Sequence, residues 1–150
     1  MRIKLEIPVK KLYEDSQLPT KGSEYAAGYD LYARITEGSL TIEPHTTVKV
    51  GTGVAMCPPV GMFGAIFARS GLATKQGLRP ANCVGVCDYD YTGEYIVALH
   101  NDTDEAQTIN NGDRIAQVVF LPYLQDDGIV EVEELPETER GDGGFGSTGE

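Results

Sequence analysis

Hydrophobic and polar positions alternate with a period of two near the start of the chain. Ile3, Leu5, Ile7 and Val9 alternate with mostly polar neighbours, which is typical of a strand with one buried face. Further apolar runs of strand length lie at residues 40–42, 48–50, 62–67, 84–86, 95–99, 115–121 and 129–132. Because Gly, Pro, Asn or Asp separates most of them, the pattern predicts an antiparallel β-sandwich or barrel.

One segment favours a helix. Residues 70–76 read Ser-Gly-Leu-Ala-Thr-Lys-Gln, which is enough for two turns at most. Serine at the start is a good N-cap, and capping alone would explain it. A helix N-terminus also attracts anions, and Arg69 beside it would add a cation. Both interpretations, a cap and an anion site, stay open at this position.

Composition narrows the possible partners. The chain has 150 residues, 41% of them hydrophobic, and a formal net charge of −11. That length suits one domain with a substantial core. Because duplex binding depends on many Lys and Arg contacts to phosphate, no nucleic-acid partner is expected. A small phosphorylated ligand needs only a local cluster of cations and is compatible with this charge.

Targeting and redox signals point to the inside of a cell. The first residues contain no continuous apolar run, and no stretch approaches the roughly 20 apolar residues of a membrane span. The three cysteines, Cys57, Cys83 and Cys87, are odd in number, which favours reduced thiols over a disulfide scaffold. We therefore expect an intracellular protein, cytoplasmic or nuclear, with no membrane partner.

A possible base follows an apolar run. The spacing predicts a hairpin with arms at residues 84–86 and 95–99, and Asp88 lies next to Cys87 at the end of the first arm. A carboxylate at a strand end can be held rigidly and can act as a base toward water. Acidic residues in turns are also often simply solvated, so both interpretations remain.

The sequence contains no established motif for metal binding or for a catalytic nucleophile. His45 and His100 are isolated in the sequence, and Cys83 and Cys87 have no second pair nearby, so a zinc site is not expected.

Arg114 and Gln117 open another predicted strand. They lie three residues apart, so in a flat strand they would face opposite ways and only one would reach a shared site.

The end of the chain has a different composition. Residues 126–139 hold seven acidic residues and no basic one, and half of residues 140–149 are glycine. Such a segment should be mobile unless something holds it. It also carries Arg140, Phe145, Ser147 and Thr148, which a linker does not need. A closing lid and a disordered polar tail are both consistent with this composition.

Five segments together resemble the five motifs of the trimeric dUTP pyrophosphatase family, in the same order. They read Ala-Ala-Gly-Tyr-Asp-Leu at 26–31, Arg-Ser-Gly-Leu-Ala at 69–73, Gly-Val-Cys-Asp-Tyr-Asp-Tyr within 82–93, Gly-Asp-Arg-Ile-Ala-Gln at 112–117 and the glycine-rich stretch at 140–149. The resemblance implies an all-β, jelly-roll-like distorted β-barrel with one short helix. It also implies a homotrimer with C-terminal arm exchange, in which residues 1–139 form the barrel and residues 140–150 close over a neighbouring site.

The resemblance implies hydrolysis of dUTP to dUMP and pyrophosphate by water attack on the α-phosphorus, with Mg²⁺ on the triphosphate. Such a reaction limits uracil in DNA and supplies dUMP. Asp88 would be the base, and Asp30 would lie near the water shell of the metal. The implied substrate contacts are Arg69, Ser70, Gly71 and Gln117 for phosphates, Asn82 for uracil, Tyr91 for deoxyribose, and Arg140, Phe145, Gly146, Ser147 and Thr148 in the arm.

Some positions depart from the family pattern. Thr92 stands where Arg or Gln is usual, and Cys83 and Cys87 stand where aliphatic residues are common. A dCTP deaminase, which shares the fold, and a non-catalytic relative are the alternatives. The presence of Tyr91 and of a complete arm with Phe145 favours the pyrophosphatase.

Overall fold

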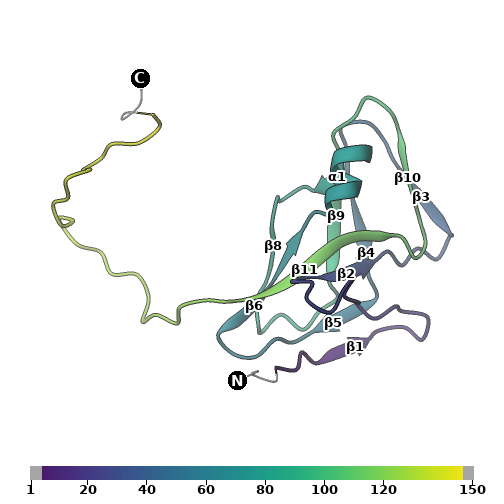
Figure 1. Ribbon diagram of the computed structural model, residues 1–150, viewed down its shortest axis with the longest axis horizontal. Coiled ribbons are helices and arrows are strands. Elements are labelled where there is room, and N and C mark those ends of the chain that lie inside the picture. The colour runs from purple at the N-terminus through teal and green to yellow at the C-terminus, as the bar shows by residue number, and fades with distance from the viewer. Residues whose placement is uncertain (1–4, 147–150) are drawn as a thin grey trace.

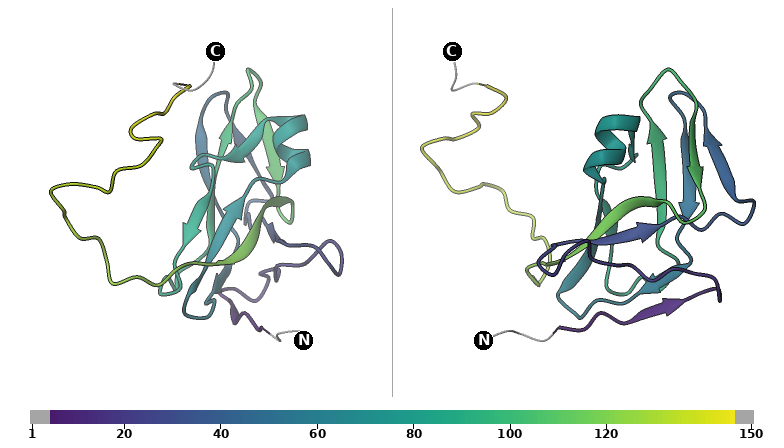
Figure 2. Two further views of the ribbon diagram at one scale, coloured as in Figure 1. Left: turned by 60° about the vertical axis from the view of Figure 1, so that its left-hand side comes forward. Right: turned by 45° about the vertical axis from the view of Figure 1, so that its right-hand side comes forward.

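The computed structural model describes residues 5–146, a body of strands followed by an extended tail (Figure 1 and Figure 2). Only one helix occurs among these residues, which confirms the predicted all-β class with one short helix. Residues 5–146 contain no helix that is long and apolar enough to cross a bilayer. The elements are β1 (Val9–Lys11), β2 (Tyr29–Tyr32), β3 (Ser39–Ile42), β4 (Thr47–Gly51), β5 (Val54–Met56), β6 (Met62–Phe67), α1 (Ser70–Gln76), β7 (Leu78–Pro80), β8 (Gly85–Cys87), β9 (Ile96–Asn101), β10 (Gln107–Asn110) and β11 (Arg114–Pro122).

Two antiparallel sheets form most of the body. One has the order β2-β11-β6-β8, and the other has the order β4-β9-β7. Two short ribbons, β1-β5 and β10-β3, complete the described ladders, which do not close into one continuous barrel. The long strand β11 pairs with β2 on one side and β6 on the other. β6, which precedes α1, and β8, which precedes Asp88, therefore belong to the same sheet.

Alternating side chains from several strands fill the core. Val97, Leu99 and Asn101 point inward from β9, as the period-two pattern requires. Full burial of an aliphatic side chain such as that of Leu99 contributes about 1.5–3 kcal/mol. The buried Asn101 amide is satisfied, because its Nδ2 donates to the carbonyls of Ile42 and Glu105 at 2.9 and 2.8 Å. This buried amide therefore holds the loop at Glu105 in place, and its two N–H groups incur no penalty for unsatisfied hydrogen bonds.

Most of the expected elements are confirmed, and two expected strands are wrong. The helix over residues 70–76 and the strand over 62–67 have the predicted bounds. Residues 129–132 form no strand, because in the described tail they have no partner to complete a ladder. In the described part of the expected N-terminal strand, β1 starts at Val9, and Ile7 packs against the core outside any strand, while Ile3 lies outside the described residues.

The predicted hairpin between residues 84–86 and 95–99 is also wrong. β8 pairs with β6, whereas β9 pairs with β4 and β7, so the two segments lie in different sheets. The connection crosses between the sheets because Tyr95 is fully buried and its N–H donates to the Val54 carbonyl at 2.8 Å. The loop over residues 88–95 is consequently anchored at its far end by the core.

The buried Tyr95 hydroxyl makes no hydrogen bond with the described residues. Burial raises its pKa, and its neighbour Cys87 is only a weak acceptor. We expect Tyr95→Phe to leave the free energy of unfolding unchanged or to raise it by about 1 kcal/mol, because it removes an unsatisfied group. Urea unfolding would measure this.

Thr52→Val is the matched comparison for Tyr95→Phe. The Thr52 hydroxyl donates to the Tyr95 carbonyl at 2.6 Å in a buried position. Its removal should lower the free energy of unfolding by about 1–3 kcal/mol. A loss of that size in Tyr95→Phe would show that the hydroxyl does have a partner.

Candidate functional site

Three predicted site residues line one pocket beside β8. Asn82, Asp88 and Tyr91 share a cavity of about 250 Å³ with Glu94 and the apolar side chain of Ile66. Their placement in one pocket is consistent with the prediction from the sequence that all three contact one substrate. The exposed carboxylate of Asp88 is open to water.

Asp88 is mounted directly on the end of β8. Cys87, the residue before it, is paired in register with Gly64 of β6. Burial raises the pKa of the Cys87 thiol, so this side chain packs as a neutral group. The Asp88 carbonyl accepts a hydrogen bond from the Tyr91 N–H at 3.1 Å, which closes a turn. Strand pairing and the turn together restrict where the carboxylate can point.

Tyr91 is held by its own loop. Its hydroxyl donates to the Glu94 carbonyl at 2.7 Å. A Cβ at position 93 would lie 2.8 Å from that hydroxyl and 2.9 Å from the ring carbon Cζ, so only glycine fits there. The ring lies 6.4 Å from the Tyr95 ring, centroid to centroid. One flat aromatic face is thereby fixed at the pocket.

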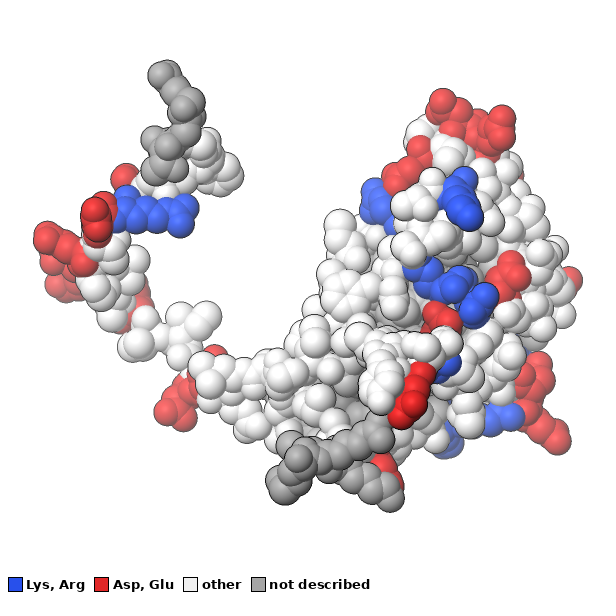
Figure 3. Space-filling view, viewed as in Figure 1, with Lys and Arg blue, Asp and Glu red and all other residues white. Residues whose placement is uncertain are grey.

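A second, more polar pocket of about 410 Å³ lies beside α1. Arg69, Gly71, Lys75 and Arg114 line it. Figure 3 shows blue Lys and Arg side chains gathered on this face of the body, while many acidic side chains follow the tail. An acidic protein thus carries a local basic cluster that could receive a phosphorylated ligand.

Asp30 organises two of these cations. Its Oδ1 lies 2.9 Å from Arg69 Nε, and its Oδ2 lies 3.5 Å from Arg114 Nη1. The Asp30 side chain is only 15% exposed, so the pairs are screened less than surface pairs. Arg69 also donates from Nη1 to the Arg114 carbonyl at 3.4 Å. The two arginines are therefore positioned by one carboxylate.

The expectation that Arg114 and Gln117 face opposite ways is wrong. The register of β11 against β2 shifts between Arg114 and Ala116, which is a β-bulge. Ile115 and Ala116 are both fully buried, so the alternation skips one residue. Arg114 and Gln117 consequently lie on the same side of the sheet.

Gln117 supports the corner between β6 and α1. Its Nε2 donates to the Ala68 carbonyl at 2.9 Å. A Cβ at position 28 would lie 2.8 Å from Gln117 Oε1, so Gly28 makes room for the amide. This places Gln117 next to the residue that precedes Arg69.

Ser70 does not cap the helix. It is the first helical residue, and the N-cap position belongs to Arg69, which makes no side-chain cap. The reason is that Arg69 keeps an extended backbone while its side chain reaches Asp30. Ser70 is exposed beside Gly71. Of the two interpretations of Ser70, the cap is excluded, and its part in an anion site stays a prediction.

The described arm residues, Arg140, Phe145 and Gly146, line neither pocket. Arg140, Phe145 and Gly146 sit in the tail that extends away from the body in Figure 1, and Phe145 is fully exposed. Arg140 Nε donates to the Gly143 carbonyl at 2.8 Å, a contact within the tail itself. Ser147 and Thr148 lie outside the described residues. Within one described chain the arm and Asp88 are not brought together.

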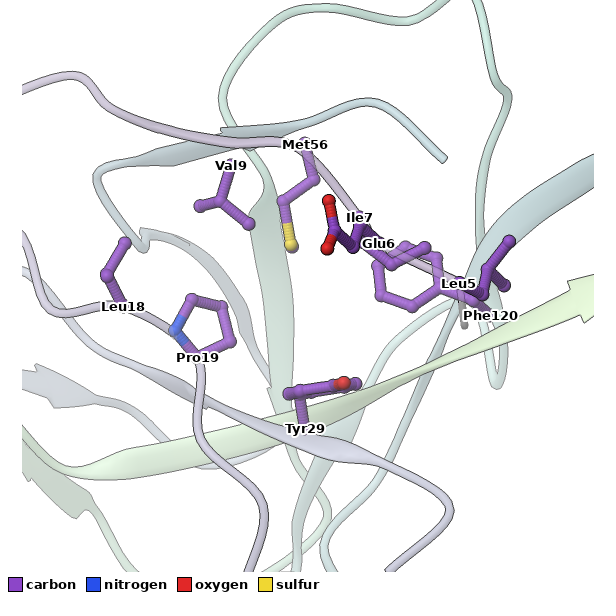
Figure 4. Close-up of a pocket in the computed structure, with 9 residues that line it drawn as sticks. All are labelled: Leu5, Glu6, Ile7, Val9, Leu18, Pro19, Tyr29, Met56 and Phe120. Carbon is purple, nitrogen blue, oxygen red and sulfur yellow. The ribbon is translucent and has the colours of Figure 1, made fainter. Parts of the chain in front are cut away.

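A third pocket of about 310 Å³ is apolar apart from Glu6 and contains none of the predicted site residues. Ile7, Met56, Tyr29 and Phe120 point into it (Figure 4). The rings of Tyr29 and Phe120 meet edge to face with centroids 6.2 Å apart. Its lining is suited to packing and offers no arrangement for chemistry on a charged ligand.

Residues 5–146 contain no cluster of three or more His, Cys, Asp or Glu side chains that could hold a metal ion. Asp30, the predicted contact to the water shell of Mg²⁺, already faces two arginines. These residues do not form a direct metal site.

Sequence reasoning missed Glu94 as a pocket residue. Its Oε1 accepts a hydrogen bond from the Gly53 N–H at 2.7 Å, so the side chain is turned toward another segment of the chain. The available signal was its position directly after Tyr91-Thr-Gly93.

Comparison with known proteins gives one family. A family model described as dUTPase matches residues 14–149. The deoxyuridine 5'-triphosphate nucleotidohydrolase of Desulfitobacterium hafniense is 47% identical over 148 residues, which cover 98% of this chain and 97% of that protein. The enzyme of the same name from Kluyveromyces lactis is 47% identical over 135 residues, covering 90% and 88%.

Solved structures agree with this result. A dUTPase variant of Staphylococcus bacteriophage 80alpha with dUpNHpp superposes with a TM-score of 0.85 at 27% identity, covering 96% of this chain and 98% of that one. A phage phi11 dUTPase variant, described with a structural Mg(II) ion, has a TM-score of 0.77 at 23% identity, covering 88% and 99%. The predicted jelly-roll-like fold is thereby confirmed.

Proposed function

Because this chain belongs to the dUTPase family, we infer that it hydrolyses dUTP to dUMP and pyrophosphate. The observation that carries the assignment of residues is that Asn82, Asp88 and Tyr91 line one pocket. The activity removes dUTP before its uracil enters DNA and supplies dUMP.

Asp88 is the general base in this proposal. Its carboxylate accepts a proton from a water molecule, and the water oxygen forms a bond to the α-phosphorus. The bond between that phosphorus and the oxygen bridging to the β-phosphate breaks, and pyrophosphate leaves with the electron pair. Such assistance typically contributes about 10²–10⁴ in rate. The position of Asp88 at the end of β8 supports this role, because a base must be held in line with its water.

Asn82 and Tyr91 select the nucleoside. The Asn82 amide offers both a donor and an acceptor to the uracil edge, and cytosine would mismatch this pattern when the orientation of the amide is held fixed. The Tyr91 ring lies under the deoxyribose and leaves no space for a 2′-hydroxyl. The rigid attachment of that ring to the Glu94 carbonyl supports a steric role.

Arg69, Ser70 and Gly71 receive the phosphates in this proposal. The Arg69 guanidinium is oriented by Asp30 and keeps donors available for a phosphate oxygen. Gln117 uses one of its amide hydrogens on the Ala68 carbonyl, and the second remains for the ligand. Neutralisation of the triphosphate by these groups would offset the acidic charge of the chain.

We propose that the site is completed by a neighbouring subunit of a homotrimer. Residues 1–139 would form the barrel domain, and residues 140–150 would close over the site of another subunit. Arg140, Ser147 and Thr148 would contact phosphates, and Phe145 with Gly146 would cover the uracil. The described part of the tail extends away from the body (Figure 1) and contributes no residue to either pocket lining, which supports exchange of the arm.

Mg²⁺ on the triphosphate is also part of the proposal. When bound, it would withdraw charge from the leaving pyrophosphate. Asp30 as a contact to its water shell stays a prediction, because the carboxylate is shared with Arg69 and Arg114. The steps written above depend on protein groups and water alone.

A nucleotide panel tests the function. Pyrophosphate release should be measured with dUTP, dCTP, dTTP and UTP at equal concentrations. We expect dUTP to be preferred over dCTP by up to about 10⁴ in kcat/KM, because cytosine leaves buried polar groups mismatched. Ammonia release from dCTP would instead indicate a deaminase, and absence of turnover with all four would contradict the proposal.

A further inference from the structure

Glu94 lines the same pocket as Asp88 but uses its side chain differently. The half-buried carboxylate reaches across to the turn between β4 and β5, where Oε1 accepts the Gly53 N–H at 2.7 Å. That bond joins segments 41 residues apart in sequence. Because the bond ties the residue after Gly93 to a distant turn, this contact can hold the loop.

The turn that receives Glu94 is itself rigid. Gly53 has a φ of 70°, a left-handed conformation that favours glycine. Its carbonyl accepts the Leu12 N–H at 2.8 Å from the other side. The neighbouring Thr52 hydroxyl donates to the Tyr95 carbonyl at 2.6 Å. The turn is therefore a fixed platform against which the loop over residues 88–95 rests.

The same residue also holds Tyr91. The backbone carbonyl of Glu94 accepts the Tyr91 hydroxyl at 2.7 Å, while its side chain is anchored to Gly53. Gly93 between them has no room for a side chain against the Tyr91 ring. A displacement of the Glu94 backbone would therefore move the ring.

We propose that Glu94 is a positioning residue for sugar selection. Its carboxylate accepts the Gly53 N–H and thereby fixes the position of the Tyr91 ring. That position sets the space available at the sugar 2′ position. This inference rests on the proposed function, in which the ring of Tyr91 lies under deoxyribose. Glu94 has no proton-transfer role in this scheme.

Two different substitutions should break the hydrogen bond between the Glu94 carboxylate and the Gly53 N–H. Glu94→Ala removes the carboxylate. Gly51→Ala keeps it but would place a Cβ 2.7 Å from Oε1, which pushes the flexible end of the side chain away. Glu94→Gln retains an amide oxygen that can accept the same N–H. An exposed acid on another turn, Glu37→Ala, is the control for loss of charge.

Steady-state kinetics with dUTP and with UTP, together with thermal unfolding of each variant, tests the proposal. Glu94→Ala should raise KM for dUTP by about tenfold and lower the dUTP-to-UTP ratio of kcat/KM by about tenfold or more, with kcat changed little. Gly51→Ala should change both quantities in the same direction and add little in the Glu94→Ala background. Glu94→Gln and Glu37→Ala should stay near the wild type.

The outcomes distinguish a failure of the proposed function from a failure of the role of Glu94. Wild-type protein without dUTP turnover would overturn the proposed function, and this inference with it. Wild-type turnover with an unchanged dUTP-to-UTP ratio in Glu94→Ala would overturn the role of Glu94 alone. A Glu94→Gln variant that behaves like Glu94→Ala would show that charge, and not the bond to Gly53, is responsible, which also overturns it.

Discussion

Asp88→Asn should lower kcat for dUTP by about 10²–10⁴-fold while leaving KM nearly unchanged. The amide has almost the size of the carboxylate and should leave the end of β8 undisturbed, but it cannot take a proton from water. The backbone of Asp88, which accepts the Tyr91 N–H, is not altered by the substitution. Single-turnover rates and binding of a non-hydrolysable dUTP analogue would separate chemistry from binding.

Asp90→Asn is the matched control for this experiment. Asp90 lies two residues further along the same exposed loop and does not line the pocket. It should retain wild-type kcat. Equal losses in both variants would mean that the charge of the loop matters and that Asp88 has no special role, and wild-type turnover in Asp88→Asn would remove it as the base.

The local part of the site could be predicted from the sequence, because each motif is a short peptide with its own geometry. Asp88 directly follows an apolar run, and the structure places it directly after β8. The helix over residues 70–76 was also predicted, and the structure ends it at Gly77, which takes the left-handed C-cap conformation with a φ of 66°.

Pairing between distant segments could not be predicted in the same way. Period-two alternation indicates a strand but not its partner, so residues 84–86 and 95–99 were joined into a hairpin that the sheets do not contain. The short strands β2, β5, β7 and β10 were missed because three or four residues give too little pattern, and β7 ends in Pro80. Their existence depends on partners supplied by the rest of the fold.

The electrostatic organisation of the site also needed the structure. The ion pair between Asp30 and Arg69 joins residues 39 apart in sequence. The β-bulge in β11 changed the expected direction of Arg114, although the consecutive apolar residues Ile115 and Ala116 were a signal of it. Glu94 was missed because its partner is a backbone N–H, which no side-chain motif reveals.

Removal of residues 140–150 should lower kcat/KM for dUTP by at least about 10²-fold, because the arm would order the triphosphate and exclude water. The hydrogen bonds of Arg140 and Gly141 described here stay within the tail, to Gly143 and Thr138. The midpoint of thermal unfolding should therefore change by no more than about 2 °C. Normal turnover in the truncated chain would reduce the arm to a passive tail.

A mixing experiment then tells whether the arm acts across subunits. Asp88→Asn chains keep the arm but lack the base, and chains without residues 140–150 keep the base but lack the arm. If each site takes its base and its arm from different subunits, random mixed trimers should contain about one complete site in four. Co-refolding the two inactive chains should then restore about a quarter of wild-type turnover. If the arm serves its own chain, every site in the mixture lacks one of the two parts, and activity stays at the level of the separate variants.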